Sequence, residues 1–190
     1  MRCKIAIIML LAGFSVLAMA TEVEIIPYGS PPLLNGIEGN KEWIHPDVVE
    51  LTQEAMSVRM KQDSQYVYLN IADGDTIHSG LDIYLDNMSG DILMLHVSSA
   101  HGERRMHDSG WSEMTFGPPE HWSSNIVENI FEDGRMKFIS PEVFEFQIDK
   151  SLLPSRSFKL MVHLKRPEMW MPPKADTLSS RDWIEVEMQR

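Results

Sequence analysis

Hydrophobic residues alternate with polar ones over most of the chain after residue 50. The alternating stretches are residues 56–61, 67–71, 81–86, 93–98, 144–149, 160–165 and 184–188. A period of two puts successive side chains on opposite faces of a strand, so each stretch predicts a strand with one buried and one solvated face. Many short strands with few helix signals predict an all-β fold. We expect an antiparallel β-sandwich of two sheets, jelly-roll or immunoglobulin-like, with little helix.

Turn-forming residues separate the predicted strands. Residues 61–65 and 86–91 are expected to link neighbouring strands, and Glu132-Asp133-Gly134 predicts another hairpin turn. Short helical turns are expected near Lys41 and at residues 149–153. Residues 99–125, rich in glycine and proline, are the least regular part, and long loops of this kind often carry function.

The amino-terminal residues have the pattern of a signal peptide. Arg2 and Lys4 precede an apolar run at residues 5–11, and Ala18-Met19-Ala20 fits a small-residue cleavage site before Thr21. The alternative is a membrane anchor, but the apolar stretch is short for a bilayer span of about 20 residues. We therefore expect a signal peptide at 1–20, one domain at 21–190, and a periplasmic or secreted protein without membrane insertion after cleavage.

The charge and cysteine content exclude several classes of function. The chain carries 17 Lys and Arg against 28 Asp and Glu, a formal net charge of −11. This balance argues against nucleic-acid binding and against docking on anionic lipid, since both need clustered basic residues. The single cysteine, Cys3, lies in the predicted signal peptide. The mature domain is thus expected to hold no disulfide, thiolate metal site or cysteine nucleophile.

The order of motifs resembles carbohydrate-binding modules of family 9 and their DOMON-like relatives. Residues 35–43, Asn-Gly-x-x-Gly-Asn-x-Glu-Trp, resemble the stretch that follows the first strand in this family. Residues 58–73 resemble its next hairpin, and residues 79–86 resemble a strand that ends in Asp. Residues 143–153 and 160–167 resemble two late strands. The resemblance covers essentially all of the domain at 21–190.

The resemblance implies a β-sandwich that binds a ligand without cleaving it. Some relatives bind sugar ends between aromatic rings, and some DOMON-like relatives bind haem. The expected function is that of an exported, lectin-like, non-catalytic module with a saccharide or other small-molecule partner.

Aromatic residues in the predicted loops are the candidates for saccharide contact, because sugar C–H faces pack on flat rings while nearby polar groups bond the hydroxyls. The candidate ligand-binding residues are Trp111, Trp122, Trp170, Arg166, His121 and Asn125. The alternative is that the rings close the ends of the sandwich. Trp43 is expected to be a core residue.

Two kinds of metal site are candidates. Asp73, Asp75 and Asp86 lie near turns and could hold calcium through their carboxylates, although aspartate in turns commonly bonds its own backbone. Met94 with His96, and Met161 with His163, form Met-x-His pairs, whose side chains share one face of a strand. Thioether and imidazole can bind copper or haem iron. Alternatively, the methionines fill a second buried face under a loop.

No catalytic motif identifies an enzyme. The sequence has no Gly-x-Ser-x-Gly elbow, no phosphate-binding loop and no His-Glu-x-x-His. The leading interpretation is a non-enzymatic carbohydrate-binding module. The first alternative is a haem- or copper-binding DOMON-like domain, and the second is an interaction domain with a protein partner in the cell envelope.

Overall fold

The computed structural model describes residues 23–37, 41–44, 46–73, 80–88, 90–108, 110–166 and 168–190. The predicted signal peptide at 1–20 and the calcium candidate Asp75 lie outside this part of the chain. Within it, no helix has the length and hydropathy to cross a membrane.

Strands make up most of the described chain, with three short 3-10 helices between them. They are β1 (Glu24–Ile26), η1 (Lys41–Trp43), β2 (Val49–Gln53), β3 (Met56–Gln62), β4 (Tyr66–Ala72), β5 (Leu81–Asp86), β6 (Ile92–Val97), β7 (His101–His107), β8 (Gly110–Trp111), β9 (Thr115–Phe116), β10 (Trp122–Ser124), β11 (Glu128–Glu132), β12 (Arg135–Ile139), β13 (Phe144–Asp149), η2 (Lys150–Leu152), β14 (Ser157–Lys165), β15 (Glu168–Met171), η3 (Ser180–Asp182) and β16 (Ile184–Met188).

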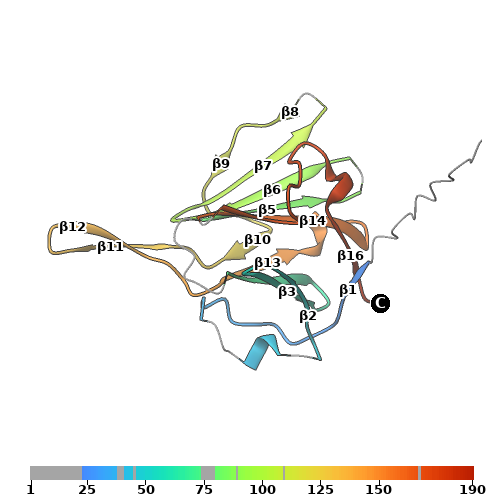
Figure 1. Cartoon of the computed structure of the whole chain (residues 1–190), viewed down its shortest axis with the longest axis horizontal. Coiled ribbons are helices and arrows are strands. Elements are labelled where there is room, and N and C mark those ends of the chain that lie inside the picture. Colours follow the sequence, from blue (N-terminus) through green and yellow to red (C-terminus); the bar gives the residue numbers. More distant parts are fainter. Residues whose placement is uncertain are drawn as a thin grey trace, which may run out of the picture.

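Two sheets stack on one another as a sandwich (Figure 1). The larger sheet has the order β1-β16-β14-β5-β6-β7-β8, with β15 paired to β14 and β9 paired to β7. The smaller sheet has the order β10-β13-β4-β3-β2. Pairing between the described strands is antiparallel, except that β1 runs parallel to β16. The predicted all-β sandwich with little helix is confirmed.

The core lies between the two sheets and uses the residues that the alternation predicts. Val58, Leu69 and Phe146 of the smaller sheet face Ile83 and Val162 of the larger one, and all five are fully buried. In antiparallel strands, directly paired residues share a face, so one register orients every side chain of the strand.

Each sheet is also covered on its outer face. On the larger sheet, Tyr84, Met94 and Met161 form a second apolar cluster with Trp183 and the partly buried Trp111. This arrangement matches the alternative in which Met94 and Met161 fill a second buried face. On the smaller sheet, the segment before β2 covers Tyr68 with Trp43, which is buried as expected.

The hairpin of β11 and β12 stands away from the sandwich (Figure 1). Its turn is at Asp133 and Gly134, where the sequence predicts one. Phe131 and Phe138 on this hairpin are 74% and 64% exposed.

The region expected to be irregular, residues 99–125, contains the seven-residue strand β7. Its sequence, His-Gly-Glu-Arg-Arg-Met-His, has no apolar alternation. The strand lies near the edge of the larger sheet, where most of its side chains are only partly buried and need not be apolar. Hydrophobic periodicity cannot reveal a strand that lacks a fully buried face.

Candidate functional site

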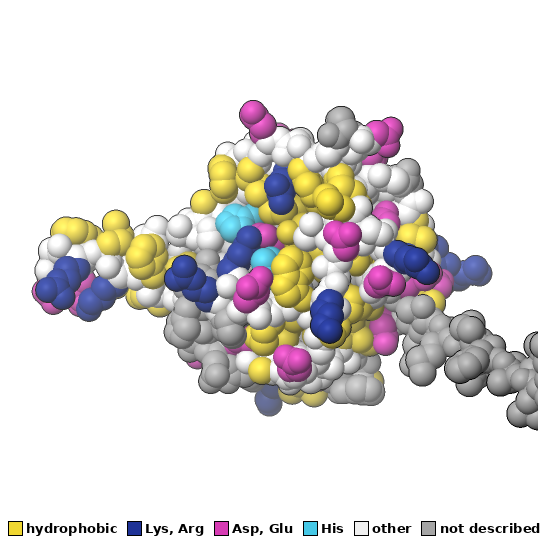
Figure 2. Space-filling view, turned by 45° about the horizontal axis from the view of Figure 1, so that its top comes forward, with side chains coloured by type: hydrophobic (Ala, Val, Ile, Leu, Met, Phe, Trp, Pro, Cys, Tyr) yellow, Lys and Arg dark blue, Asp and Glu magenta, His cyan; other side chains and the backbone are white. Residues whose placement is uncertain are grey.

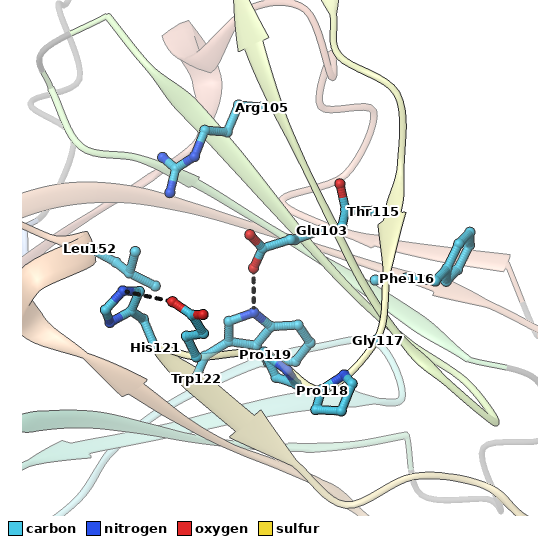
Figure 3. Close-up of a pocket in the computed structure, with 12 residues that line it drawn as sticks. Glu103, Arg105, Thr115, Phe116, Gly117, Pro118, Pro119, His121, Trp122 and Leu152 are labelled. Carbon is cyan, nitrogen blue, oxygen red and sulfur yellow. Dashed lines mark hydrogen bonds and ion pairs between the residues drawn. The ribbon is translucent and has the colours of Figure 1, made fainter.

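A pocket of about 270 Å³ opens at one side of the sandwich (Figure 3). Strand β7, the segment from Thr115 to Trp122, and Leu152 of η2 line it. Two of the residues predicted to bind ligand, His121 and Trp122, are therefore part of a cavity.

The register of β7 decides which of its side chains enter this pocket. Gly102 pairs with His96, and Arg104 pairs with Met94, so these positions share the outer face of the larger sheet. Glu103 and Arg105 alternate with them and face the other way, into the pocket (Figure 3).

Trp122 and Glu103 are joined at the base of the pocket. The indole N–H of Trp122 donates to the Oε2 atom of Glu103 at 2.8 Å. Trp122 is only 4% exposed, because its ring stacks on Phe146 at 6.1 Å and meets the edge of His101 at 5.1 Å. Trp122 is thus a rigid part of the core that fixes the position of the Glu103 carboxylate.

The lining of the pocket combines both charges with apolar surface. The polar side chains are those of Glu103, Arg105, Thr115, Glu120 and His121, and the apolar ones are those of Phe116, Pro118, Pro119, Trp122 and Leu152. His121 and Glu120 lie on the exposed rim, with 4.0 Å between Nε2 and Oε2. The pocket therefore offers hydrogen-bond donors, acceptors and an apolar wall within one small space.

Phe116 also borders the pocket, but its ring turns outward (Figure 3). Its ring points away from Glu103 in Figure 3, and it meets the ring of His96 edge-on with 6.2 Å between centroids. The glycine at position 102 leaves space for this ring, because any Cβ there would lie only 3.0 Å from the ring of Phe116.

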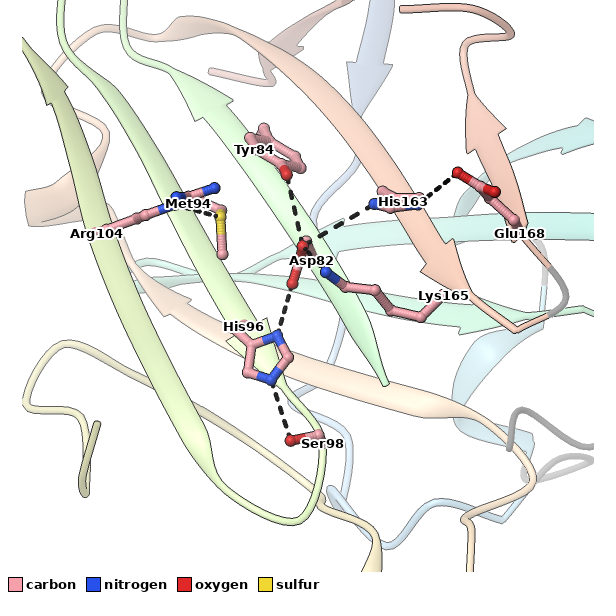
Figure 4. Close-up of polar contacts among 9 residues, drawn as sticks. All are labelled: Asp82, Tyr84, Met94, His96, Ser98, Arg104, His163, Lys165 and Glu168. Atoms are coloured by element: carbon pink, nitrogen blue, oxygen red, sulfur yellow. Dashed lines mark hydrogen bonds and ion pairs between the residues drawn. The ribbon is translucent and has the colours of Figure 1, made fainter. Parts of the chain in front are cut away.

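A cluster of charged side chains occupies the outer face of the larger sheet (Figure 4). Its centre is Asp82, which is 2% exposed. The Oδ1 atom of Asp82 lies 2.7 Å from Nδ1 of His96, and Oδ2 lies 2.6 Å from Nζ of Lys165. On the other neighbouring strand, Nδ1 of His163 is 4.0 Å from Oδ2. Figure 2 shows histidine and basic side chains gathered among hydrophobic ones on this face.

The partners of Asp82 keep it ionised. Burial alone would raise the pKa of this carboxyl, but the hydrogen bonds from His96 and Lys165 outweigh burial and lower the pKa below its usual value. For His163, burial lowers the pKa, Lys165 lowers it further, and the attraction of Asp82 and Glu168 opposes both.

Trp170 and Trp111 lie on this outer face and not in the pocket. Trp170 stacks on His163 with 3.6 Å between ring centroids and 8° between planes. Trp111 meets Tyr84 edge-on at 5.9 Å, and the guanidinium of Arg104 lies 4.6 Å from its ring centroid. The three candidate tryptophans therefore do not converge on one groove.

The remaining two candidate ligand residues, Arg166 and Asn125, do not line this pocket. Arg166 is exposed just beyond the end of β14. Asn125 donates to the carbonyl of Val143 and accepts from the N–H of Glu145, so its amide joins β13 to the segment after β10. Asn125 also borders a wider hollow of about 640 Å³ beside the base of the β11–β12 hairpin.

The described residues include no group of three or more His, Cys, Asp or Glu side chains arranged to hold a metal ion. Asp86 accepts from the Ser180 hydroxyl and from the N–H of Met88, and Asp73 is 2% exposed at the end of β4. The Sδ atom of Met94 accepts from Nε of Arg104 at 3.1 Å, while Met161 is fully buried. Calcium, haem and copper binding stay predictions.

Sequence reasoning did not single out Glu103, Arg105 or Lys165. Glu103 and Arg105 belong to β7, whose strand character has no periodic signal, so their common orientation was not visible. Lys165 continues the alternation of β14, and its place on the face of His163 could have been predicted from that spacing.

Comparisons with known proteins found similarity to a solved structure. No protein-family model matches the chain, and no curated protein matches it. Among solved structures, the chain is similar to a family 9 carbohydrate-binding module from Caldicellulosiruptor kristjanssonii in complex with cellotriose, at 13% identity and a TM-score of 0.43, over 88% of this chain and 94% of that chain. That family is the one whose motifs the sequence resembles. The DOMON-like part of the resemblance stays a prediction.

Proposed function

We propose that the pocket beside β7 binds a saccharide. One observation carries the proposal: the Glu103 carboxylate, fixed by the indole N–H of Trp122, faces a small cavity with an apolar wall of Pro118 and Pro119. Sugars need this combination, because their C–H faces pack on apolar surface while each hydroxyl donates and accepts hydrogen bonds.

The size and charge of the pocket favour a short, uncharged ligand. Its 270 Å³ lies just below the range of about 300–1,000 Å³ that drug-sized ligands occupy. Two carboxylates, Glu103 and Glu120, share the pocket lining with one guanidinium, that of Arg105, and with the imidazole of His121. An acidic sugar would be attracted by Arg105 but repelled by the two carboxylates, so a neutral saccharide end is the better match.

Isothermal titration calorimetry with a panel of neutral and acidic oligosaccharides, cellotriose among them, tests the proposal. Glu103→Gln keeps an oxygen that can accept from Trp122 but removes the charge that would bond sugar hydroxyls. A hydrogen bond to a charged group contributes about 1.5–3 kcal/mol, so we expect affinity to fall at least about tenfold. Glu113→Gln, an exposed carboxylate outside the pocket lining, is the matched control and should bind as the wild type.

The same titration separates this pocket from the outer face. Trp170→Ala should leave the affinity unchanged, because its ring stacks on His163 on the other side of the larger sheet. Binding lost in Trp170→Ala but kept in Glu103→Gln, or no binding to any neutral saccharide, overturns the proposal.

We also propose that the protein is exported and that residues 1–20 are removed. The support is the basic start, the apolar run and the Ala18-Met19-Ala20 site. Mass spectrometry of the protein recovered from the periplasm or the medium should give a first residue of Thr21. An intact Met1 in the recovered protein contradicts the proposal.

A further inference from the structure

Three side chains on the outer face of the larger sheet form a continuous hydrogen-bonded relay. Nε2 of His96 lies 3.0 Å from the Oγ atom of Ser98, and Nδ1 of the same ring lies 2.7 Å from Oδ1 of Asp82 (Figure 4). The carboxylate is buried, while His96 and Ser98 are half-buried at the surface.

The register of the sheet builds this relay. Asp82 of β5 is the direct cross-strand partner of His96 of β6. Ser98 lies two residues after His96, a spacing that puts both side chains on the same face of the sheet. Gly80 leaves room for it, because a Cβ at Gly80 would lie 3.0 Å from the Cβ atom of Ser98. No sequence motif marks the three residues, since Asp82 becomes a neighbour of His96 only through strand pairing.

The carboxylate determines the state of the imidazole. An ionised carboxylate only accepts hydrogen bonds, so Nδ1 of His96 carries a proton. In the neutral ring Nε2 is then the acceptor, and the Ser98 hydroxyl donates to it. The other oxygen of Asp82, Oδ2, is bonded to Lys165, which leaves Oδ1 to His96. The hydroxyl is thereby placed against a base whose tautomer is fixed.

We propose that Ser98, His96 and Asp82 form a nucleophilic triad that transfers the acyl group of a short-chain carboxylic ester to Ser98 and then to water. Ser98 is the nucleophile, His96 is the general base and acid, and Asp82 is the positioning residue. The inference goes beyond saccharide binding in the pocket and does not depend on it.

The reaction balances with these groups and water. The Oγ atom of Ser98 forms a bond to the acyl carbon while its proton passes to Nε2 of His96. The ester C–O bond then breaks, and the leaving alcohol takes that proton from His96. Water next attacks the acyl-serine and gives a proton to His96. The bond between the acyl carbon and Oγ breaks, Oγ recovers the proton, and the carboxylic acid leaves.

The surroundings suit a short acyl chain. The ring of Phe116, which is 63% exposed, meets the ring of His96 edge-on and offers apolar surface beside the imidazole. The ammonium of Lys165 bonds Asp82 with one of its three N–H donors. This ion pair holds the Asp82 carboxylate in place behind the imidazole of His96.

Labelling with a fluorophosphonate probe tests the proposal on the full mature chain, because such a probe becomes covalently bound only to an activated serine. Peptide mapping by mass spectrometry identifies the labelled residue, and hydrolysis of p-nitrophenyl acetate gives an independent rate. Ser98→Ala should abolish labelling, while Ser99→Ala, an exposed serine of the same turn, should be labelled as the wild type.

Asp82→Asn separates positioning from stability. If Asp82 positions His96, the labelling rate of the folded protein falls at least about tenfold, with the circular dichroism spectrum unchanged. The expected overall result is an adduct on Ser98 and hydrolysis that Ser98→Ala loses. Labelling of no serine, labelling of a different serine, or equal hydrolysis by Ser98→Ala and wild type overturns the proposal.

Discussion

The buried carboxylate of Glu145 accepts a hydrogen bond from the indole N–H of Trp43 at 2.8 Å, across 102 residues of sequence. Its other oxygen accepts from the backbone N–H of Gly36, also at 2.8 Å. Glu145 is fully buried and belongs to β13, which lies between β10 and β4 in the smaller sheet. Two of the motifs that resemble family 9 thus meet at one carboxylate, which holds the segment before β2 against the outer face of the sheet.

Removing this carboxylate should destabilise the fold. Glu145→Ala leaves the buried N–H groups of Trp43 and Gly36 without their acceptor, and each such loss costs about 1–3 kcal/mol. We expect the free energy of unfolding, measured with urea, to fall by at least about 2 kcal/mol. Glu113→Ala, an exposed glutamate, should change it by less than about 0.5 kcal/mol. Equal effects of the two substitutions would contradict this role of Glu145.

Stability should fall as the pH is lowered from about 7.5 to 5.5, where free imidazoles titrate. Burial lowers the pKa of His101, although its hydrogen bond with Ser124 acts in the opposite direction. Burial also lowers the pKa of His163, and the positive charge of Lys165 lowers it further. The unfolded chain therefore binds more protons than the folded one below about pH 6.5, so stability rises with pH in this range.

Urea unfolding at several pH values checks this sign. His101→Gln and His163→Gln should each reduce the slope of stability against pH, because Gln does not titrate. A stability that is flat or rises on acidification between pH 7.5 and 5.5 contradicts the prediction.

The exposed rings of the β11–β12 hairpin should contribute nothing to the stability of the sandwich. Phe131→Ser and Phe138→Ser change residues that are 74% and 64% exposed, so the unfolding free energy should move by less than about 0.5 kcal/mol. The matched core variant Phe146→Ala, at a fully buried ring that stacks on Trp122, should cost about 3–5 kcal/mol. A fall of more than about 1 kcal/mol in the free energy of unfolding of either hairpin variant would refute the prediction.

Gly80 should tolerate a side chain less well than Gly90. Both have positive φ, at 122° and 99°, but a Cβ at Gly80 would lie 2.7 Å from the backbone oxygen of Val97, while a Cβ at Gly90 meets nothing within 4 Å. Gly90→Ala should show only the backbone strain of about 1–3 kcal/mol. Gly80→Ala adds the clash, so its melting temperature should fall further than that of Gly90→Ala, and the reverse order contradicts this account.

The sequence is a good guide to the fold because burial repeats with a fixed period. Val58, Leu69, Ile83 and Phe146 lie in the core as the alternation predicts, because one strand register orients every side chain on it. Ile184 also belongs to an alternating stretch, but it is only partly buried and packs against the margin of the core. The parallel pairing of β1 with β16 has no sequence signal, because it depends on which sheet edge the first strand reaches.

The site is less predictable, for two physical reasons. Candidate rings can be selected by type, but whether Trp122 and Trp170 meet depends on which sides of the sheet their segments reach, and the structure separates them. The charged residues that complete the site, Glu103 and Asp82, come together with their partners through cross-strand pairing and packing, which composition does not encode.

The indole N–H resonance of Trp122 in a proton–nitrogen NMR spectrum gives the most direct test of saccharide binding in the pocket, because this N–H is bonded to Glu103 beneath the cavity. Trp→Phe variants assign the five tryptophan signals. On titration with a neutral oligosaccharide that binds, the Trp122 signal should shift with the bound fraction while those of Trp111 and Trp170 stay in place. Shifts confined to Trp111 and Trp170, with Trp122 unmoved, would contradict the account.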